Sequence, residues 1–222
     1  MKKVPPYPFE QIAEIKARKV REGVQLVDFG IGDPDLPTPP HIVEALCEAA
    51  KDPATHTYDD SGSGLPEFRR AVAEWYRGRF GVDLDPETEV QHLIGSKEGI
   101  AHIFLAFVEN GDCCLVPDPR YMVYSVGAGF AGGWFYPMPL RPENGFLPDL
   151  DAIPEEVGRN ARIMFLNYPN NPTGAVAPKE FFEKAVEFAR ERGILLCQDC
   201  AYSEVAFDGI RPASILSVEG AK

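Results

Sequence analysis

The sequence predicts an α/β protein built around a mainly parallel sheet, and three observations support that fold class. From residue 89 onward, short apolar runs alternate with longer amphipathic segments. Such alternation is typical of strands joined by crossover helices, which make the strands parallel. Polar clusters follow the apolar runs directly, and ligands of open parallel sheets gather at the carboxyl ends of the strands.

The first part of the chain is predicted to contain little core. Helices are expected over residues 11–21 and 41–51, and a short strand over residues 26–29. The glycines and prolines of residues 30–40 indicate a shaped loop, which is either a mere linker or a place where backbone approaches a ligand. Residues 57–64 form a second polar loop.

The remainder of the chain carries the predicted sheet. A long helix is expected over residues 65–80, with Pro66 allowed in its first turn. Further helices are expected over 97–109, from about 121, near 150 and over 178–192. The apolar runs predict five strands, at 90–94, 113–116, 134–138, 162–166 and 194–198.

Composition narrows the possible functions. The 222 residues can bury a full core, and 45% are hydrophobic and 25% charged, which is typical of a globular protein. The net charge of −12 argues against binding to nucleic acid or to an anionic membrane. No apolar run approaches the roughly 20 residues of a membrane helix. Residues 1–6 lack the apolar core of a signal peptide, so a cytoplasmic location is expected.

The five cysteines are interpreted as packing residues. Their odd number does not suggest a disulfide framework. Cys197 and Cys200 form a C-x-x-C pair, but on a strand this spacing sends the two side chains to opposite faces. No second pair completes a zinc set, so neither a redox nor a metal site is expected.

The predicted strand 90–94 ends in Gly95-Ser96-Lys97-Glu98-Gly99, directly before a helix. The N–H groups and the dipole of a helix N-terminus favour an anion. Gly95 allows close approach of the backbone, Ser96 adds a hydroxyl and Lys97 adds charge. The run predicts a phosphate cradle, although an ordinary serine N-cap has the same pattern. It has neither the Walker spacing nor the dinucleotide-binding one.

Two further strand ends present a ring and an amide. The prolines of residues 117–121 stiffen the turn that carries Tyr121, which either stacks on a flat ligand or packs into the core. The strand 162–166 ends in Asn167-Tyr168-Pro169-Asn170-Asn171-Pro172-Thr173-Gly174. The amide of Asn171 could donate to a ligand oxygen, unless this segment is a turn held only by its own asparagines.

Asp199 closes the last apolar run, and Tyr202 follows three residues later. A carboxylate at the tip of a buried strand costs roughly several kcal/mol unless a cation or donor lies opposite. That partner could be a ligand, or Asp199 could simply cap the next turn. Together the strand ends suit a flat, phosphorylated ligand with an oxygen substituent and a basic ring nitrogen. Pyridoxal phosphate has these features, and a carboxylate would keep its nitrogen protonated.

The segments 167–174 and Asp199-x-x-Tyr202 resemble the class I/II aminotransferases of the type I pyridoxal-phosphate fold. The runs 30–39 and 95–99 resemble the branch that contains the LL-diaminopimelate aminotransferases. The resemblance covers nearly the whole chain and implies a three-layer αβα arrangement, with helices on both faces of the sheet. It implies an N-terminal arm and the start of a small domain in residues 1–40. Residues 41–222 would then be an incomplete large domain that binds pyridoxal phosphate.

The resemblance also implies roles for single residues. Ser96 and Lys97 match the phosphate-binding turn, and Tyr121 matches the aromatic residue stacked on the pyridine ring. Tyr58 matches a tyrosine that reaches the phosphate bound by the neighbouring subunit. The implied assembly is a homodimer with shared active sites.

The remaining assignments concern the ring and the substrate. Asn171 and Tyr202 match the donors to the phenolic oxygen of the cofactor, and Asp199 matches the partner of its ring nitrogen. Gly32 matches a loop glycine beside the substrate carboxylate. The implied activity is transfer of an amino group between an L-amino acid and a 2-oxo acid.

The family's Schiff-base lysine, which also moves the substrate proton, lies in a Ser-x-Ser-Lys-like motif. Lys222 has no such motif, so this lysine is expected beyond Lys222, and no catalytic residue is assigned within the chain. The chain is expected to be an N-terminal portion that is inactive alone. Two alternatives remain open. A pyridoxal-phosphate C–S lyase shares every motif, and a cofactor-sensing domain would need a DNA-binding pattern that the residues before Gly30 lack.

Overall fold

The computed structural model of the chain describes residues 8–30, 32, 35–58 and 62–222. The chain divides into two compact units, Met1–Asp60 and Ser61–Lys222. Ile31, Asp33 and Pro34 of the first predicted loop lie outside the described residues, as do residues 59–61 of the second. The predicted domain boundary at residue 40 falls within the first unit and stays a prediction for the full-length protein.

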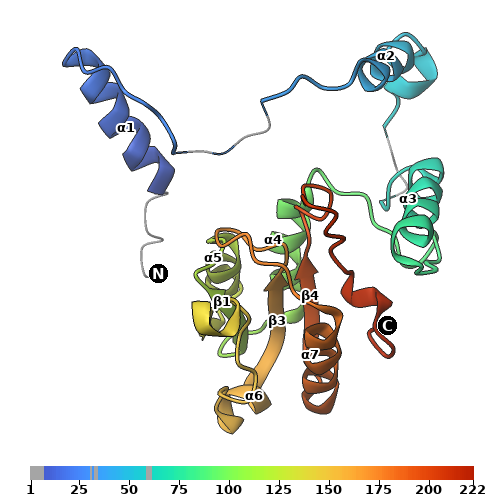
Figure 1. Cartoon of the computed structure of the whole chain (residues 1–222). Coiled ribbons are helices and arrows are strands. Elements are labelled where there is room, and N and C mark those ends of the chain that lie inside the picture. The colour runs from blue at the N-terminus through green and yellow to red at the C-terminus, as the bar shows by residue number, and fades with distance from the viewer. Residues whose placement is uncertain (1–7, 31, 33–34, 59–61) are drawn as a thin grey trace. The chain divides into compact units, whose positions relative to one another are not determined.

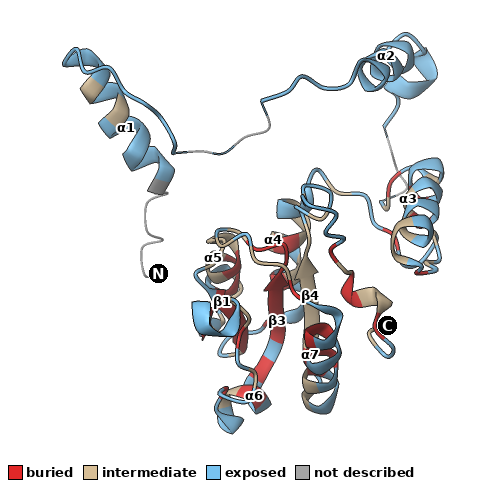
Figure 2. Ribbon diagram, in the orientation of Figure 1, coloured by how far each residue is buried: buried red, intermediate tan, exposed pale blue. Residues whose placement is uncertain are grey.

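The first unit consists of helices that bury no described residue. It contains α1 (Pro8–Arg21), α2 (Pro40–Ala49) and the 3₁₀ helix η1 (Pro53–His56). The predicted strand at 26–29 is wrong, because this segment pairs with no strand in the described part of the chain, and Phe29 is 93% exposed. A strand needs a hydrogen-bonded neighbour, which a local apolar run cannot supply. No described residue of this unit is drawn in red, the colour of buried residues, in Figure 2.

The second unit is organised by a four-stranded sheet in which every pairing is parallel. Its order is β2-β1-β3-β4. The strands are β1 (Cys113–Asp118), β2 (Trp134–Pro139), β3 (Ala161–Asn167) and β4 (Leu195–Asp199). The predicted parallel α/β fold is therefore confirmed, and all four carboxyl ends meet at one edge of the sheet.

Two helices precede the first strand, α3 (Pro66–Phe80) and α4 (Ser96–Phe107). The crossover segments between consecutive strands contain α5 (Val123–Phe130), α6 (Glu155–Asn160) and α7 (Lys179–Arg192). Short 3₁₀ turns follow β2 and β4, namely η2 (Pro142–Asn144) and η3 (Ile215–Ser217). The helix expected near residue 150 begins five residues later, at Glu155. α7 ends at Arg192, and the next residue, Gly193, has φ 65°, a left-handed conformation that glycine adopts without strain. That glycine turns the chain into β4.

Successive side chains of the strands pack alternately into two hydrophobic cores, one on each face of the sheet. Cys113 and Leu115 of β1 pack with the apolar face of α7, whereas Cys114 and Val116 pack with α4 and α5. This alternation follows from the two-residue period of a strand. Burial of each large apolar side chain contributes roughly 1.5–3 kcal/mol. The predicted three-layer αβα arrangement is confirmed and can be followed in Figure 1.

The predicted strand at 90–94 is wrong. The segment has no strand partner among the described residues, and its polar groups bond to a loop instead. His92 N donates to Ser63 O at 3.0 Å, and the Gln91 side chain donates to Gly62 O at 2.9 Å. Ile94 is 89% exposed. The apolar run correctly marks a segment that leads into α4, but only a strand alongside could make it part of a sheet.

Among the described residues, no helix has both the length and the apolar character needed to cross a membrane. The cytoplasmic location expected from the sequence stays a prediction.

Candidate functional site

A cavity of about 300 Å³ lies at the carboxyl ends of the strands, at the low end of the volumes of ligand sites. It brings together six of the eight predicted site residues, which come from four separate segments of the second unit. Its lining consists of Gly95, Ser96, Lys97, Tyr121, Asn167, Asn171, Asp199, Ala201 and Tyr202. The predicted convergence of the strand ends is therefore present in the fold.

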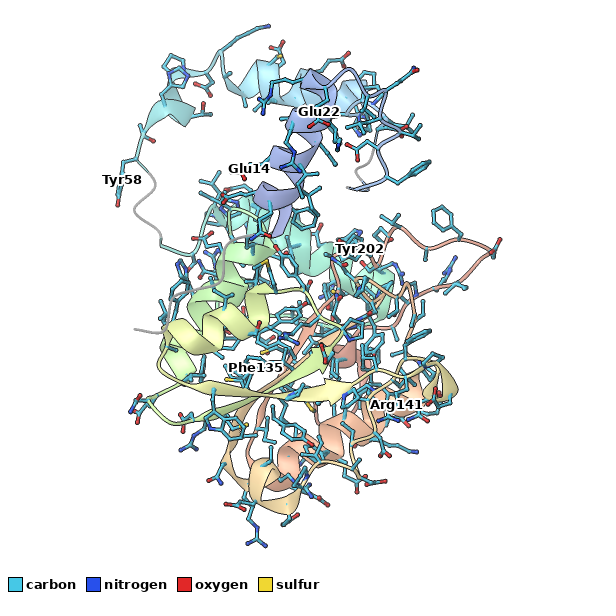
Figure 3. All side chains as sticks on the ribbon, turned by 90° about the vertical axis from the view of Figure 1, so that its left-hand side faces the viewer. Glu14, Glu22, Tyr58, Phe135, Arg141 and Tyr202 are labelled. Atoms are coloured by element: carbon cyan, nitrogen blue, oxygen red, sulfur yellow. The ribbon has the colours of Figure 1, made fainter. Side chains whose placement is uncertain are left out.

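The other two predicted residues, Gly32 and Tyr58, belong to the first unit. Both are exposed, and the side chain of Tyr58 extends away from the backbone with 90% of its surface open (Figure 3). Their roles toward substrate and neighbouring subunit stay predictions.

Asp199 is the last residue of β4, and its carboxylate accepts a hydrogen bond from a buried tyrosine. The hydroxyl of Tyr124 donates to Asp199 Oδ2 at 2.7 Å, whereas Oδ1 lies 3.4 Å from the backbone nitrogen of Ala201. Tyr124 is fully buried in α5. Burial and the neighbouring Asp199 carboxylate raise the pKa of Tyr124 far above its ordinary value, so this phenol is a neutral donor. The protein itself thus supplies one partner for the carboxylate.

Asn167 is a second residue of the site that the sequence analysis did not select. It is 2% exposed and occupies the last position of β3, in register with Asp199 of β4. Its side chain donates to Asp199 O at 2.8 Å and accepts from Asn171 N at 2.7 Å. Tyr124 was detectable by its position three residues after Tyr121, on the same side of a helical turn. Asn167 was detectable as the first of the clustered asparagines.

The turn before α4 forms another wall. Gly95 has φ 75° and ψ 155°, a conformation that side chains with a Cβ rarely adopt. It places Ser96 and Lys97 in the first turn of α4, where backbone N–H groups lack intrahelical acceptors. Lys97 Nζ lies 5.8 Å from the centre of the Tyr121 ring, within cation–π range. Positive charge and a helix N-terminus therefore adjoin the aromatic ring.

Aromatic and amide groups complete the cavity. The Tyr121 ring meets Tyr124 edge to face, with centroids 5.9 Å apart. Asn171 Nδ2 lies 3.5 Å from the hydroxyl of Tyr202, which is 42% exposed and is labelled in Figure 3. Tyr124 is packed in turn against Phe165 of β3, so the floor of the site is continuous with the core.

A neighbouring hollow of about 470 Å³ shares Asn171 and Tyr202 with the cavity. Its lining comes from the segments 169–176 and 205–210 and contains mainly apolar side chains, with no lysine, arginine or histidine. It lacks the positive charge that an anionic ligand requires. The smaller cavity is therefore the better site for a phosphorylated ligand.

Cys113 and Cys114 are buried packing residues, and Cys197 and Cys200 are partly buried, but the prediction is wrong for Cys47, which is exposed on α2. Burial raises the pKa of Cys113 to about 11 and the pKa values of Cys114 and Cys197 to about 12. Cys200 is also a free thiol. No group of three or more histidine, cysteine or acidic residues suited to a metal occurs within the described ranges.

The fold and the cavity define a class of α/β protein that holds a phosphorylated ring at the carboxyl ends of parallel strands. An acid, a cation beside a helix N-terminus, an aromatic ring, an amide and a phenol converge there. This donor set fits pyridoxal phosphate. The chain belongs to the class I and II aminotransferase family, whose family model matches residues 24–221. Members of this family use pyridoxal phosphate, so the predicted resemblance and cofactor are confirmed.

The curated relatives include LL-diaminopimelate aminotransferases. That of Desulforudis audaxviator is 59% identical over 222 residues, and that of Syntrophobacter fumaroxidans is 56% identical over 221 residues. Each match covers 100% of this chain, but only 56% and 57% of the respective relative. The chain thus spans little more than half the length of the relatives it matches.

Solved structures agree on the fold. Apo-BacF from Bacillus subtilis superposes with a TM-score of 0.92 at 42% identity, covering 99% of this chain and 56% of that one. The N-succinyldiaminopimelate aminotransferase of Mycobacterium tuberculosis superposes with a TM-score of 0.84 at 34% identity, covering 95% and 54%.

Proposed function

We propose that the full-length protein transfers an amino group between an L-amino acid and a 2-oxo acid with pyridoxal phosphate. The observation that carries this proposal is the convergence of Asp199, Tyr121 and the Ser96–Lys97 turn on one cavity. Membership of the class I and II family supports it. When bound, the cofactor accepts electrons from the substrate carbon and so makes its proton easier to remove.

Different residues of the cavity bind different parts of the cofactor. Ser96 and Lys97 bind the phosphate with the N-terminus of α4, and Tyr121 stacks on the ring. Asn171 and Tyr202 donate to the phenolic oxygen. Asp199, whose other oxygen is held by a neutral tyrosine, keeps a proton on the ring nitrogen.

The first unit contributes the substrate and subunit contacts. Gly32 lies beside the substrate carboxylate, and Tyr58 reaches the phosphate bound by a second copy of the chain. The exposed position of Tyr58 and the lack of any buried residue among the described residues of this unit support a homodimer with shared sites. Such a surface is expected to be covered in the assembled protein.

The lysine that carries the cofactor is proposed to lie beyond Lys222. Lys222 Nζ donates to Glu89 Oε2 at 2.7 Å and to Asp83 O at 2.9 Å. It does not line the cavity. These contacts support a structural role for Lys222, whose side chain binds the loop between α3 and α4.

The names of the relatives suggest which substrate to test first. LL-diaminopimelate is named for relatives 50–59% identical to this chain, so we propose it as the amino donor. The full-length protein should convert LL-diaminopimelate to the corresponding 2-oxo acid, while a 2-oxo acid acceptor takes up the amino group and becomes an amino acid. Release of thiol and a 2-oxo acid from a cysteine conjugate, with no new amino acid, would instead identify a C–S lyase.

Borohydride reduction with bound pyridoxal phosphate, followed by peptide mapping, locates the lysine independently. The proposal expects one modified lysine, beyond residue 222. Stoichiometric modification of Lys222 or Lys97 would contradict it.

A further inference from the structure

We propose that Asn167 is a positioning residue, whose buried carboxamide fixes Asp199 and Asn171 relative to each other. This inference rests on the proposed function, because it concerns the two groups assigned to the ring nitrogen and the phenolic oxygen. Asn167 also lines the cavity, but both ends of its carboxamide are engaged by Asp199 O and Asn171 N, so we expect it to act through these neighbours.

The carboxamide joins two segments of the chain. Asn167 and Asp199 are the last register pair of β3 and β4. Asn167 Nδ2 donates to Asp199 O at 2.8 Å, and Asn167 Oδ1 accepts from Asn171 N at 2.7 Å. One side chain therefore holds the end of β4 and the loop after β3 at the same time.

A carboxamide is the group that satisfies both contacts. Asp199 O is an acceptor and needs a donor, whereas Asn171 N is a donor and needs an acceptor. An aspartate in place of Asn167 would keep the acceptor, lose the donor and add a charge. A hydrocarbon side chain would satisfy neither group. Because Asn167 is 2% exposed, bulk water cannot replace it.

Loss of the Asn167 carboxamide affects its two hydrogen-bond partners, Asp199 O and Asn171 N, unequally. Asp199 O also accepts from Tyr168 N at 3.2 Å, so it keeps one partner. Asn171 N loses the acceptor that fixes the start of its turn. The side chain of Asn171, 3.5 Å from the Tyr202 hydroxyl, then loses its fixed position at the cavity wall. The consequence falls mainly on the group that contacts the phenolic oxygen.

Gln198 offers a matched control. It precedes Asp199 on β4, and its carboxamide also joins backbone groups, donating to Ala213 O at 3.0 Å and accepting from Ile215 N at 2.7 Å, with a longer contact of 3.5 Å to Tyr168 O. It lines no part of the cavity. Removal of either carboxamide breaks two comparable contacts, but only Asn167 holds residues assigned to the cofactor.

The test uses the full-length protein with Asn167→Ala, Asn167→Asp and Gln198→Ala. Two quantities are measured: the Kd for pyridoxal phosphate, and the pH at which the visible absorption band of the bound cofactor changes. Asn167→Ala should weaken binding by about tenfold or more and shift that pH, because a partner of the phenolic oxygen is displaced. Gln198→Ala should lower the melting temperature but leave Kd within about twofold and the absorption change unmoved.

Asn167→Asp keeps the shape of the side chain and retains the acceptor for Asn171 N, but it loses the donor to Asp199 O and adds a buried charge at the cavity. Its Kd should therefore rise. Equal effects of Asn167→Ala and Gln198→Ala, or parental values for both Asn167 variants, would overturn the inference. A parent protein that binds no pyridoxal phosphate would instead overturn the proposed function on which it rests.

Discussion

Replacing Tyr124 by phenylalanine removes one hydroxyl from the floor of the site and leaves its packing in place. The Tyr124 ring is stacked on Phe165 with centroids 4.7 Å apart and meets Tyr121 edge to face. A phenyl ring keeps both contacts. The variant therefore isolates the 2.7 Å hydrogen bond to Asp199 Oδ2.

The size of the effect follows from charge and burial. A hydrogen bond to a charged group contributes roughly 1.5–3 kcal/mol, and Tyr124 is fully buried. In the free cavity, water can pair with Asp199 after the hydroxyl is lost. A bound cofactor ring excludes that water, so removal of the hydrogen bond destabilises the protein–cofactor complex more than the free protein. We expect cofactor binding to weaken by about tenfold to a hundredfold.

The assay is a fluorescence titration of the full-length protein with pyridoxal phosphate. Tyr168→Phe is the matched control, because Tyr168 is 2% exposed and its hydroxyl donates to Phe146 O, also at 2.7 Å, in the other core. This control should lose stability without a change in Kd. Equal Kd values for Tyr124→Phe and the parent protein would refute the claim that Tyr124 supports Asp199.

Three further predictions address the turn, the thiols and the chain end. Gly95→Ala should lower both the melting temperature and cofactor affinity, because alanine is strained at a φ of 75° by about 1–3 kcal/mol. The added Cβ has no neighbour within 4 Å, so this strain is the whole cost. The free energy of unfolding, measured in urea, should fall as the pH rises above about 9, since thiols ionise in the unfolded chain while the pKa values of Cys113, Cys114 and Cys197 stay at about 11–12 in the fold. The slope should approach about 1.4 kcal/mol per pH unit for each thiol and be smaller in Cys197→Ala; a flat profile would contradict this. Lys222→Met should leave amino transfer within about twofold of the parent rate, whereas abolished activity would assign Lys222 to the chemistry.

Local patterns were sufficient for most elements of the fold. Residues 113–116 of β1 and 163–166 of β3 are continuously apolar because both faces of the sheet are covered there. The 178–192 segment has a clear apolar face for the core. Residues 26–29 and 90–94 also contain apolar residues, interrupted by Asp28 in the first segment and by Gln91 and His92 in the second. Their state depends on whether another strand lies alongside, which no local pattern encodes.

The site was predictable to the extent that its residues stand at element ends or in the loops that follow them. Ser96 begins α4 and Asp199 ends β4, whereas Tyr121 and Asn171 lie in the loops that follow β1 and β3. The strand order brings all four to one cavity. Tyr124 and Asn167 act across 75 and 32 residues of chain, respectively, to reach Asp199. Those contacts arise only once the strands are aligned.

Asp199 is proposed to keep a proton on the ring nitrogen of pyridoxal phosphate. The nitrogen resonance of 15N-labelled cofactor, bound to the full-length protein and to its Asp199→Asn variant, reports this proton. We expect a protonated nitrogen in the parent protein and a resonance displaced toward the unprotonated position in the variant. The same resonance in both proteins would contradict this proposal.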